Sequence, residues 1–169
     1  MEVTKRTSQY TPLKIVNNKY TVIMWDLKPI TKTNAKGETV ETPLAVWQEY
    51  EFDHIASLNE IKSVIIHYYN EKIDEKIISG LIWKDMNIWL SSENQFNYKV
   101  AYDLAVQTNG ASLPMTFKFG SNEDAVYYEF KTLEDLADFY MSSINHIQAT
   151  LQEGWIIKDD INWELYENS

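Results

Sequence analysis

The sequence predicts an α+β fold in which antiparallel β-hairpins are interleaved with three amphipathic helices and preceded by an N-terminal β-ribbon. Apolar residues recur at helical spacing in three segments, and each segment begins with a Ser or Thr suited to a helix N-cap. Short β-rich runs stand in pairs around polar turns, and such short connections join antiparallel strands. Hydrophobic residues make up 44% of the 169 residues, which is enough for a packed core.

The ribbon is predicted from two aromatic, β-rich runs, Lys19–Leu27 and Leu44–Phe52, with a solvated loop between Pro29 and Pro43. Residues 1–18 are polar and aperiodic, so we expect an arm that either frays or orders against a partner or the domain edge. An isolated hairpin is marginally stable in water, so the ribbon must pack on the main domain or on another chain. Residues 1–53 are therefore interpreted as an arm and an aromatic β-hairpin.

The first helix of the body is predicted from Leu58 to about Lys72, because Ser57 and Glu60 have the spacing of a capping box. A central hairpin is expected between Lys76 and Leu90, with a polar turn at Lys84–Asn87. One tryptophan stands on each side of that turn, and we expect both rings to anchor the core: Trp83 and Trp89.

The second helix is predicted over 93–109, with Ser92 as its N-cap and Gly110 just beyond its end. Helical spacing marks its expected apolar face: Phe96, Val100 and Leu104, with Ala101 or Ala105.

A last hairpin over 115–131 and a third helix complete the body of residues 54–154. Thr132 is the expected N-cap of this helix, which should stop before Gly154. Residues 155–169 are interpreted as an acidic C-terminal tail, whose regular structure the pattern does not indicate.

Charge and composition argue against two classes of partner. The chain has 25 acidic and 15 basic residues and a net charge of −10, whereas binding to a phosphate backbone depends on clustered Lys and Arg. We therefore expect no nucleic-acid partner. No apolar run approaches the roughly 20 residues that span a bilayer, and no basic amphipathic helix is present, so we expect no membrane partner. The N-terminus lacks the apolar stretch of a secretory signal.

The sequence offers few residues arranged for catalysis, metal binding or phosphate binding. It has no cysteine, and its three histidines, His54, His67 and His146, lie in different predicted elements. His67 and Glu71 could meet on one helix, but they would supply at most half of a metal site. The adjacent acids at 123–124 and 159–160 fit solvated turns, and the five glycines form no phosphate-binding loop. We therefore assign no catalytic, cofactor-binding or metal-binding residue and expect a protein that is not an enzyme.

The aromatic side chains of the ribbon are the one candidate binding surface. Tyr and Trp are favoured at the centres of protein interfaces. The candidate partner-binding residues are Tyr20, Trp25, Trp47, Tyr50 and Phe52. Contact with another protein and packing within the chain both remain open for them. Stacking on a carbohydrate ring is a further alternative.

Several features of the body occur together: a helix containing Glu60-Ile-Lys62, Tyr69 before a polar junction, the arm, turn and arm of Ile82–Leu90, a helix ending in Asn109-Gly110, Phe117 and Phe119 opening a hairpin, and Leu133–Tyr140 opening the last helix. In this combination the segment from Leu58 to about Leu151 resembles the domain of unknown function 4376 family, found mainly in tailed phages and prophages. The segment is a little over half of the chain.

The resemblance implies a structural component of a tailed-phage virion, associated with tail, baseplate or fibres and made in the cytoplasm of the bacterial host. It implies other virion proteins as partners and no catalytic residues, and it leaves a homo-oligomer open. Two alternatives stand beside it: an assembly chaperone for a fibre or tail protein that is absent from the virion, and a carbohydrate-binding receptor module.

Overall fold

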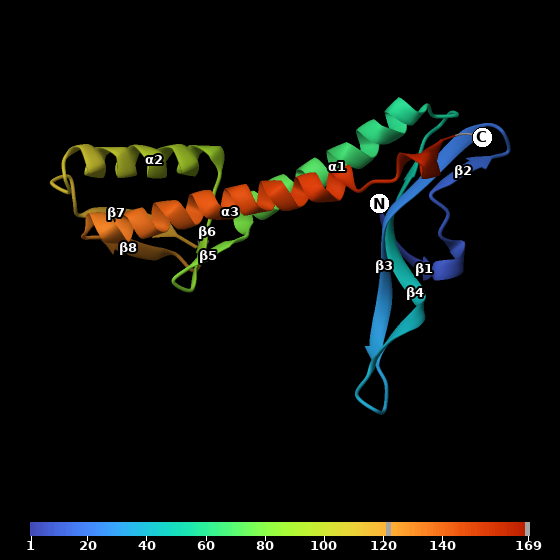
Figure 1. The fold of residues 1–169 in the computed structure, drawn as a ribbon, viewed down its shortest axis with the longest axis horizontal. Helices are drawn as coiled ribbons and strands as arrows, with labels where there is room; N and C mark the ends of the chain where they lie inside the picture. Colours follow the sequence, from blue (N-terminus) through green and yellow to red (C-terminus); the bar gives the residue numbers. More distant parts are fainter. Residues whose placement is uncertain (121–122, 168–169) are drawn as a thin grey trace. The chain divides into compact units, whose positions relative to one another are not determined.

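The computed structural model describes residues 1–120 and 123–167 (Figure 1). Its helices and antiparallel strands confirm the predicted α+β class. The chain forms two compact units, one made of Met1–His67 together with the residues from Ile161 onward, and the other of Tyr68–Asp160. We call these unit 1 and unit 2. This grouping differs from the expected division after residues 53 and 154, because the first turns of the first helix and the C-terminal segment belong with the sheet.

Unit 1 contains a four-stranded antiparallel sheet in the order β1-β4-β3-β2. The predicted ribbon supplies the two central strands, β3 (Tyr20–Thr33) and β4 (Thr39–Glu51). The N-terminal arm orders against the two edges of this ribbon, as β1 (Glu2–Arg6) and β2 (Leu13–Val16). Pairing with the long central strands satisfies the backbone of these short, charged segments, which have no periodicity of their own.

The prediction of a long loop from Pro29 to Pro43 is wrong. β3 and β4 continue through it, with Thr31 opposite Glu41 and Thr33 opposite Thr39, so only a short turn remains. In that turn the Gly37 amide donates to the Asn34 carbonyl, and Gly37 adopts a positive φ of 81°. The two prolines led to the wrong prediction of a loop. A strand tolerates proline wherever the missing N–H would have pointed away from the hydrogen-bonded neighbour strand.

The C-terminal segment returns to unit 1. After α3 it forms a short 3₁₀ helix, η2 (Trp163–Tyr166), and the buried Tyr166 hydroxyl donates to the Met24 carbonyl at 3.0 Å. Lys62 lies over the Trp163 ring, 5.4 Å from its centroid. Of the predicted tail, residues 155–159 therefore extend α3, and the part from Ile161 onward belongs to the sheet unit.

Two helices are longer than predicted. α1 (Leu58–Ser79) continues seven residues beyond Lys72, because Ile73 and Ile77 keep helical spacing and only Gly80 ends the helix, donating its amide to the Lys76 carbonyl. α3 (Leu133–Asp159) passes through Gly154 rather than stopping before it. A side chain at Gly154 would overlap Ile73, so this glycine is explained by close packing of two helices and not by a helix end.

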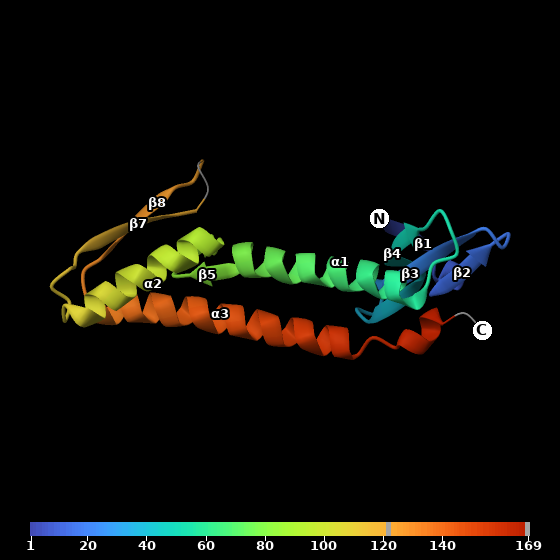
Figure 2. The ribbon, with the colours of Figure 1, turned by 90° about the horizontal axis from the view of Figure 1, so that it is seen from above.

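Unit 2 packs two short hairpins and α2 (Ser92–Gln107) against α3. The hairpins are β5 (Leu81–Trp83) with β6 (Met86–Ile88), and β7 (Met115–Phe119) with β8 (Val126–Phe130). Their shared core is aromatic: the Trp83 ring stacks on Phe130 and meets Phe139 edge-on, with centroid distances of 5.6 and 5.1 Å. Figure 2 shows α2 running alongside α3.

The expectation for the two hairpin tryptophans is half right. Trp83 is buried, and its indole N–H donates to Asp138 at 2.9 Å, whereas Trp89 is 55% exposed. Strand alternation explains the difference, because Leu81, Trp83 and Ile88 point into the core and their neighbours Ile82 and Trp89 point out.

The predicted helix caps are mostly confirmed. The Ser57 hydroxyl accepts the Glu60 amide and Glu60 accepts the Ser57 amide, as a capping box requires. Thr132 accepts the Asp135 amide at 3.2 Å. For α2 the N-cap is Ser91 rather than Ser92, because it is the Ser91 hydroxyl that accepts the Asn94 amide.

Candidate protein-docking surface

The structure places most of the candidate ribbon residues inside unit 1. Trp25, Trp47 and Phe52 are buried, Tyr20 is half-buried, and Tyr50 is exposed. Trp47 packs with Val22, Met24 and Ala45, and the Tyr10 ring from the N-terminal arm meets it edge-on at 5.7 Å. The expectation that this set forms a partner-binding surface is therefore wrong for its three buried members. The edge strands and Tyr10 cover rings that the ribbon alone would expose.

The same burial bears on carbohydrate stacking, which needs an accessible aromatic face. Unit 1 has a mainly polar hollow of about 440 Å³ on its sheet, and Tyr20 is the aromatic residue that lines it. Lys5, at its rim, already forms an ion pair with Glu49 at 3.0 Å. The indoles of Trp25 and Trp47 are not available to a sugar there. No observation in this hollow favours a saccharide over another polar ligand.

A row of exposed apolar side chains at helical spacing lies on α2 in unit 2. Phe96, Val100 and Leu104 occur at i, i+4 and i+8 on α2, and they are 66%, 47% and 44% exposed. We call these three side chains the α2 face. The predicted apolar face joined these three residues to Ala101 or Ala105; the structure buries the two alanines and leaves the three larger side chains exposed.

α2 has two apolar faces, and the face with the lower hydropathy is the buried one. Tyr98, Ala101 and Ala105 point into unit 2, where the Tyr98 ring meets Phe139 at 4.9 Å and Phe117 at 5.1 Å. Burial raises the pKa of Tyr98 to about 12. Alanine and tyrosine score below Phe, Val and Leu in hydropathy, so periodicity alone selects the wrong side.

A groove between α2 and α3 borders the α2 face. It has a volume of about 300 Å³, and its walls are formed mainly by Gln95, Phe96, Lys99, Tyr140, Ile144 and Ile147. The Tyr102 and Tyr140 rings stack at 4.6 Å and join the two helices. Phe96 thus belongs both to the groove and to the α2 face.

One ion pair borders the α2 face on the side of the groove. Lys99 donates to Asp103 at 2.6 Å, four residues further along the helix. This hydrogen bond raises the pKa of Lys99 above its usual range. Both side chains are about half exposed, so they remain accessible to a partner that covers the α2 face.

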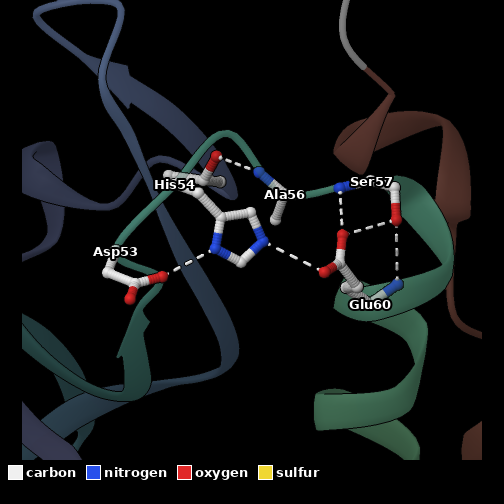
Figure 3. A network of polar contacts seen from close by, with 6 residues as sticks. Asp53, His54, Ala56, Ser57 and Glu60 are labelled. Atoms are coloured by element: carbon white, nitrogen blue, oxygen red, sulfur yellow. Dashed lines mark hydrogen bonds and ion pairs between the residues drawn. The ribbon is translucent and has the colours of Figure 1, made fainter.

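A polar network in unit 1 joins the segment that follows β4 to the start of α1 (Figure 3). The His54 imidazole lies between two carboxylates, with Nδ1 2.7 Å from Asp53 and Nε2 3.0 Å from Glu60. These bonds raise the pKa of His54. Hydrogen bonds from Ser57 and His54 lower the pKa of Glu60 to about 2.

This network has the residue types of a nucleophilic triad but not its geometry. The Ser57 hydroxyl donates to Glu60 at 2.6 Å, and both ring nitrogens of His54 are bonded to carboxylates. A general base needs a free ring nitrogen facing the hydroxyl. The arrangement instead joins the helix cap of α1 to the end of the ribbon.

The other sequence candidates are dispersed. His67 lies on α1 with Glu71, and the His146 ring lies 3.0 Å from the Lys76 carbonyl in unit 2. Asp159 and Asp160 are exposed at the end of α3. Within residues 1–120 and 123–167, no group of three or more His, Cys, Asp or Glu side chains has a metal-binding arrangement. In the same residues no helix combines the length and apolar character needed to cross a bilayer.

A scan against protein-family models found no match for this chain, and comparisons with curated proteins and with solved structures found none either. The resemblance to the phage family therefore stays a prediction from the sequence.

Proposed function

We propose that this chain is a non-catalytic structural component of a tailed-phage virion, an adaptor of tail, baseplate or fibres that docks on neighbouring virion proteins through the α2 face. The phage setting, and synthesis in the cytoplasm of a bacterial host, rest on the family resemblance of residues 58–151. The docking role rests on one observation, the exposure of Phe96, Val100 and Leu104 in a single row.

Such a row suits a binding surface. Single exposed apolar residues are ordinary, but a contiguous apolar patch on a monomer marks a contact site. Full burial of a Val, Leu or Phe side chain contributes about 1.5–3 kcal/mol, so covering three half-exposed ones supplies several kcal/mol of driving force. Anchors at i, i+4 and i+8 are also the pattern by which helices dock on other proteins.

The core of unit 2 does not require these side chains. Trp83, Phe119, Phe130 and Phe139 already pack against one another and against Tyr98. The α2 face is thus free to serve contact rather than folding. No reaction is assigned to the His54 network, since both ring nitrogens are bonded to carboxylates and Glu60 caps α1.

The test compares Val100→Glu with a matched control in particles purified from cells that express the variants. Glutamate is a better helix former than valine, so Val100→Glu should leave α2 folded while placing a charge in the docking surface. Val126→Glu is the control, because Val126 lies on β8 and is 44% exposed, close to the 47% of Val100. We expect Val100→Glu to lower the amount of this chain per particle at least about tenfold, since desolvating a charge costs more than 1.4 kcal/mol. Val126→Glu should not.

Mass spectrometry of the purified particles gives the readout, with circular dichroism as the check on folding. A wild-type chain that is missing from mature particles but bound to a fibre or tail protein in the lysate contradicts the virion role and favours the assembly chaperone. Equal incorporation of both variants contradicts docking through the α2 face.

A further inference from the structure

We propose that the occupant of the α2 face is the α2 face of a second copy of this chain, paired antiparallel about a two-fold axis near Val100. This inference deepens the proposed function and rests on its claim that the α2 face is a contact surface. Isologous two-fold contacts are the commonest form of self-association, and they require a patch that complements itself.

The apolar row meets this requirement. In an antiparallel pair centred on Val100, each Phe96 lies opposite Leu104 of the second copy, and the two Val100 side chains meet at the centre. The large ring is thereby matched with a branched aliphatic side chain at both ends, rather than with a second ring. α2 has 16 residues, so the pair is about 24 Å long at 1.5 Å per residue.

The charges on the groove side of the row also complement themselves. Lys99 and Asp103 lie on the same side of α2, as their ion pair shows. A two-fold axis brings this side of one helix against the same side of the other, in the reverse direction. Lys99 then comes within about 3 Å, measured along the helix axis, of Asp103 in the second copy and equally of Lys99 there, so two attractive Lys–Asp contacts outweigh one Lys–Lys repulsion. Each copy contributes one such pair.

The charges also select the direction of pairing. A parallel pair has its two-fold axis along the helices, which brings the groove side of one α2 against the opposite side of the other, so Lys99 and Asp103 of the two copies would not meet. At the ends of the antiparallel pair, Glu93 lies opposite the neutral Gln107, so no like charges meet there.

A second copy fits this surface better than a basic partner does. The net charge of −10 would favour a basic partner at long range. The groove beside the α2 face, however, is lined by no carboxylate, and Lys99 is its one charged residue. A basic segment lying in the groove would therefore meet a cation, whereas a second copy brings Asp103 together with Lys99 to this place.

The test uses charge reversal in the full-length chain, measured by sedimentation velocity over a concentration series. Lys99→Glu gives a helix with two acidic groups at the border of the α2 face, and Asp103→Lys gives one with two basic groups. Each reversal turns two attractive cross-pairs into repulsive ones, so we expect each variant alone to self-associate about tenfold more weakly than the wild type.

The two variants mixed in equal amounts should restore the association, because each acidic group then meets a basic one in both cross-pairs. An affinity tag on one variant makes the mixed dimer measurable by its retention of the untagged chain. An exposed ion pair between residues four apart contributes little to the stability of a helix, so both variants should stay folded, which circular dichroism checks.

A wild-type chain that stays monomeric at sub-millimolar concentration overturns the proposal, as does self-association that neither reversal weakens. If each variant is weakened and the mixture is not restored, the antiparallel arrangement is wrong. A monomeric wild type whose Val100→Glu variant is nevertheless lost from particles separates the two proposals, because docking on another virion protein then stands and pairing with a second copy fails.

Discussion

At the scale of single residues, the hydrogen bonds of His54 connect two segments of unit 1. Its ring lies between Asp53, its neighbour in sequence, and Glu60, which reaches back from the first turn of α1. The capping box of Ser57 and Glu60 was predictable, because it is a local pattern of spacing. The addition of His54 was not, since it depends on how the chain turns between β4 and α1.

The protonation of His54 makes a prediction about stability and pH. Its pKa is raised in the folded chain, mainly by the hydrogen bond to Asp53 and next by that to Glu60. A raised pKa contributes stability that is fully present below the unfolded value of about 6.5 and is lost as pH rises through the folded value. We therefore expect the difference in free energy of unfolding between the wild type and His54→Gln to shrink as pH rises from mildly acidic to mildly alkaline.

Urea unfolding of both proteins at several pH values measures this difference. Taking the difference removes the contributions of the ionisable groups that both proteins share. A gap that stays constant with pH, or widens as pH rises, contradicts a stabilising imidazolium at this position.

At the scale of elements, the sequence predicts which segments form helices and strands more reliably than which face is buried or where an element ends. Phe96, Val100 and Leu104 have clear periodicity but face outward, because the core needed the smaller Ala101 and Ala105 at the contact with the rest of unit 2. The place of the candidate docking surface therefore came from the structure. Gly154 likewise looked like the end of a helix, because the contact that explains it comes from α1.

That contact makes a second prediction. In an isolated helix Gly→Ala is stabilising by about 1 kcal/mol. At Gly154 an added methyl group would overlap Ile73, and crowding of this kind costs about 1–3 kcal/mol. We expect Gly154→Ala to destabilise the wild type by about 1 kcal/mol, the difference between these two effects.

Ile73→Ala removes the atoms that the new methyl group would meet, so it provides the matched background. In that background Gly154→Ala should become neutral or stabilising. Chemical unfolding of the four proteins in this double-mutant cycle gives the coupling free energy. Additive effects of the two substitutions would mean that the two helices do not pack at Gly154 as described.

At the scale of the whole molecule, the chain closes unit 1 with segments from both of its ends. The Tyr10 hydroxyl, from the N-terminal arm, and the Tyr166 hydroxyl, from the C-terminal segment, both donate to the Met24 carbonyl, at 3.2 and 3.0 Å. Neither contact could be predicted from the sequence, because pairing between distant segments leaves no periodic signal. The sequence placed residues 1–18 and 155–169 outside the body for the same reason.

Shortening the chain after Asp160 should therefore weaken unit 1 and spare unit 2. It removes the buried Tyr166 and the ring of Trp163 beneath Lys62, and loss of a buried aromatic side chain costs about 3–5 kcal/mol. Tyr166→Phe, which keeps the ring and loses only the hydroxyl, should cost about 0.5–1.5 kcal/mol. Amide hydrogen exchange distinguishes the units: amides of β3 and β4 should exchange faster in the shortened chain, while those of α2 and β5–β8 keep their wild-type protection. Equal loss of protection in both sets would show that the C-terminal segment supports the whole chain, and no loss in β3 would show that it only rests on the sheet.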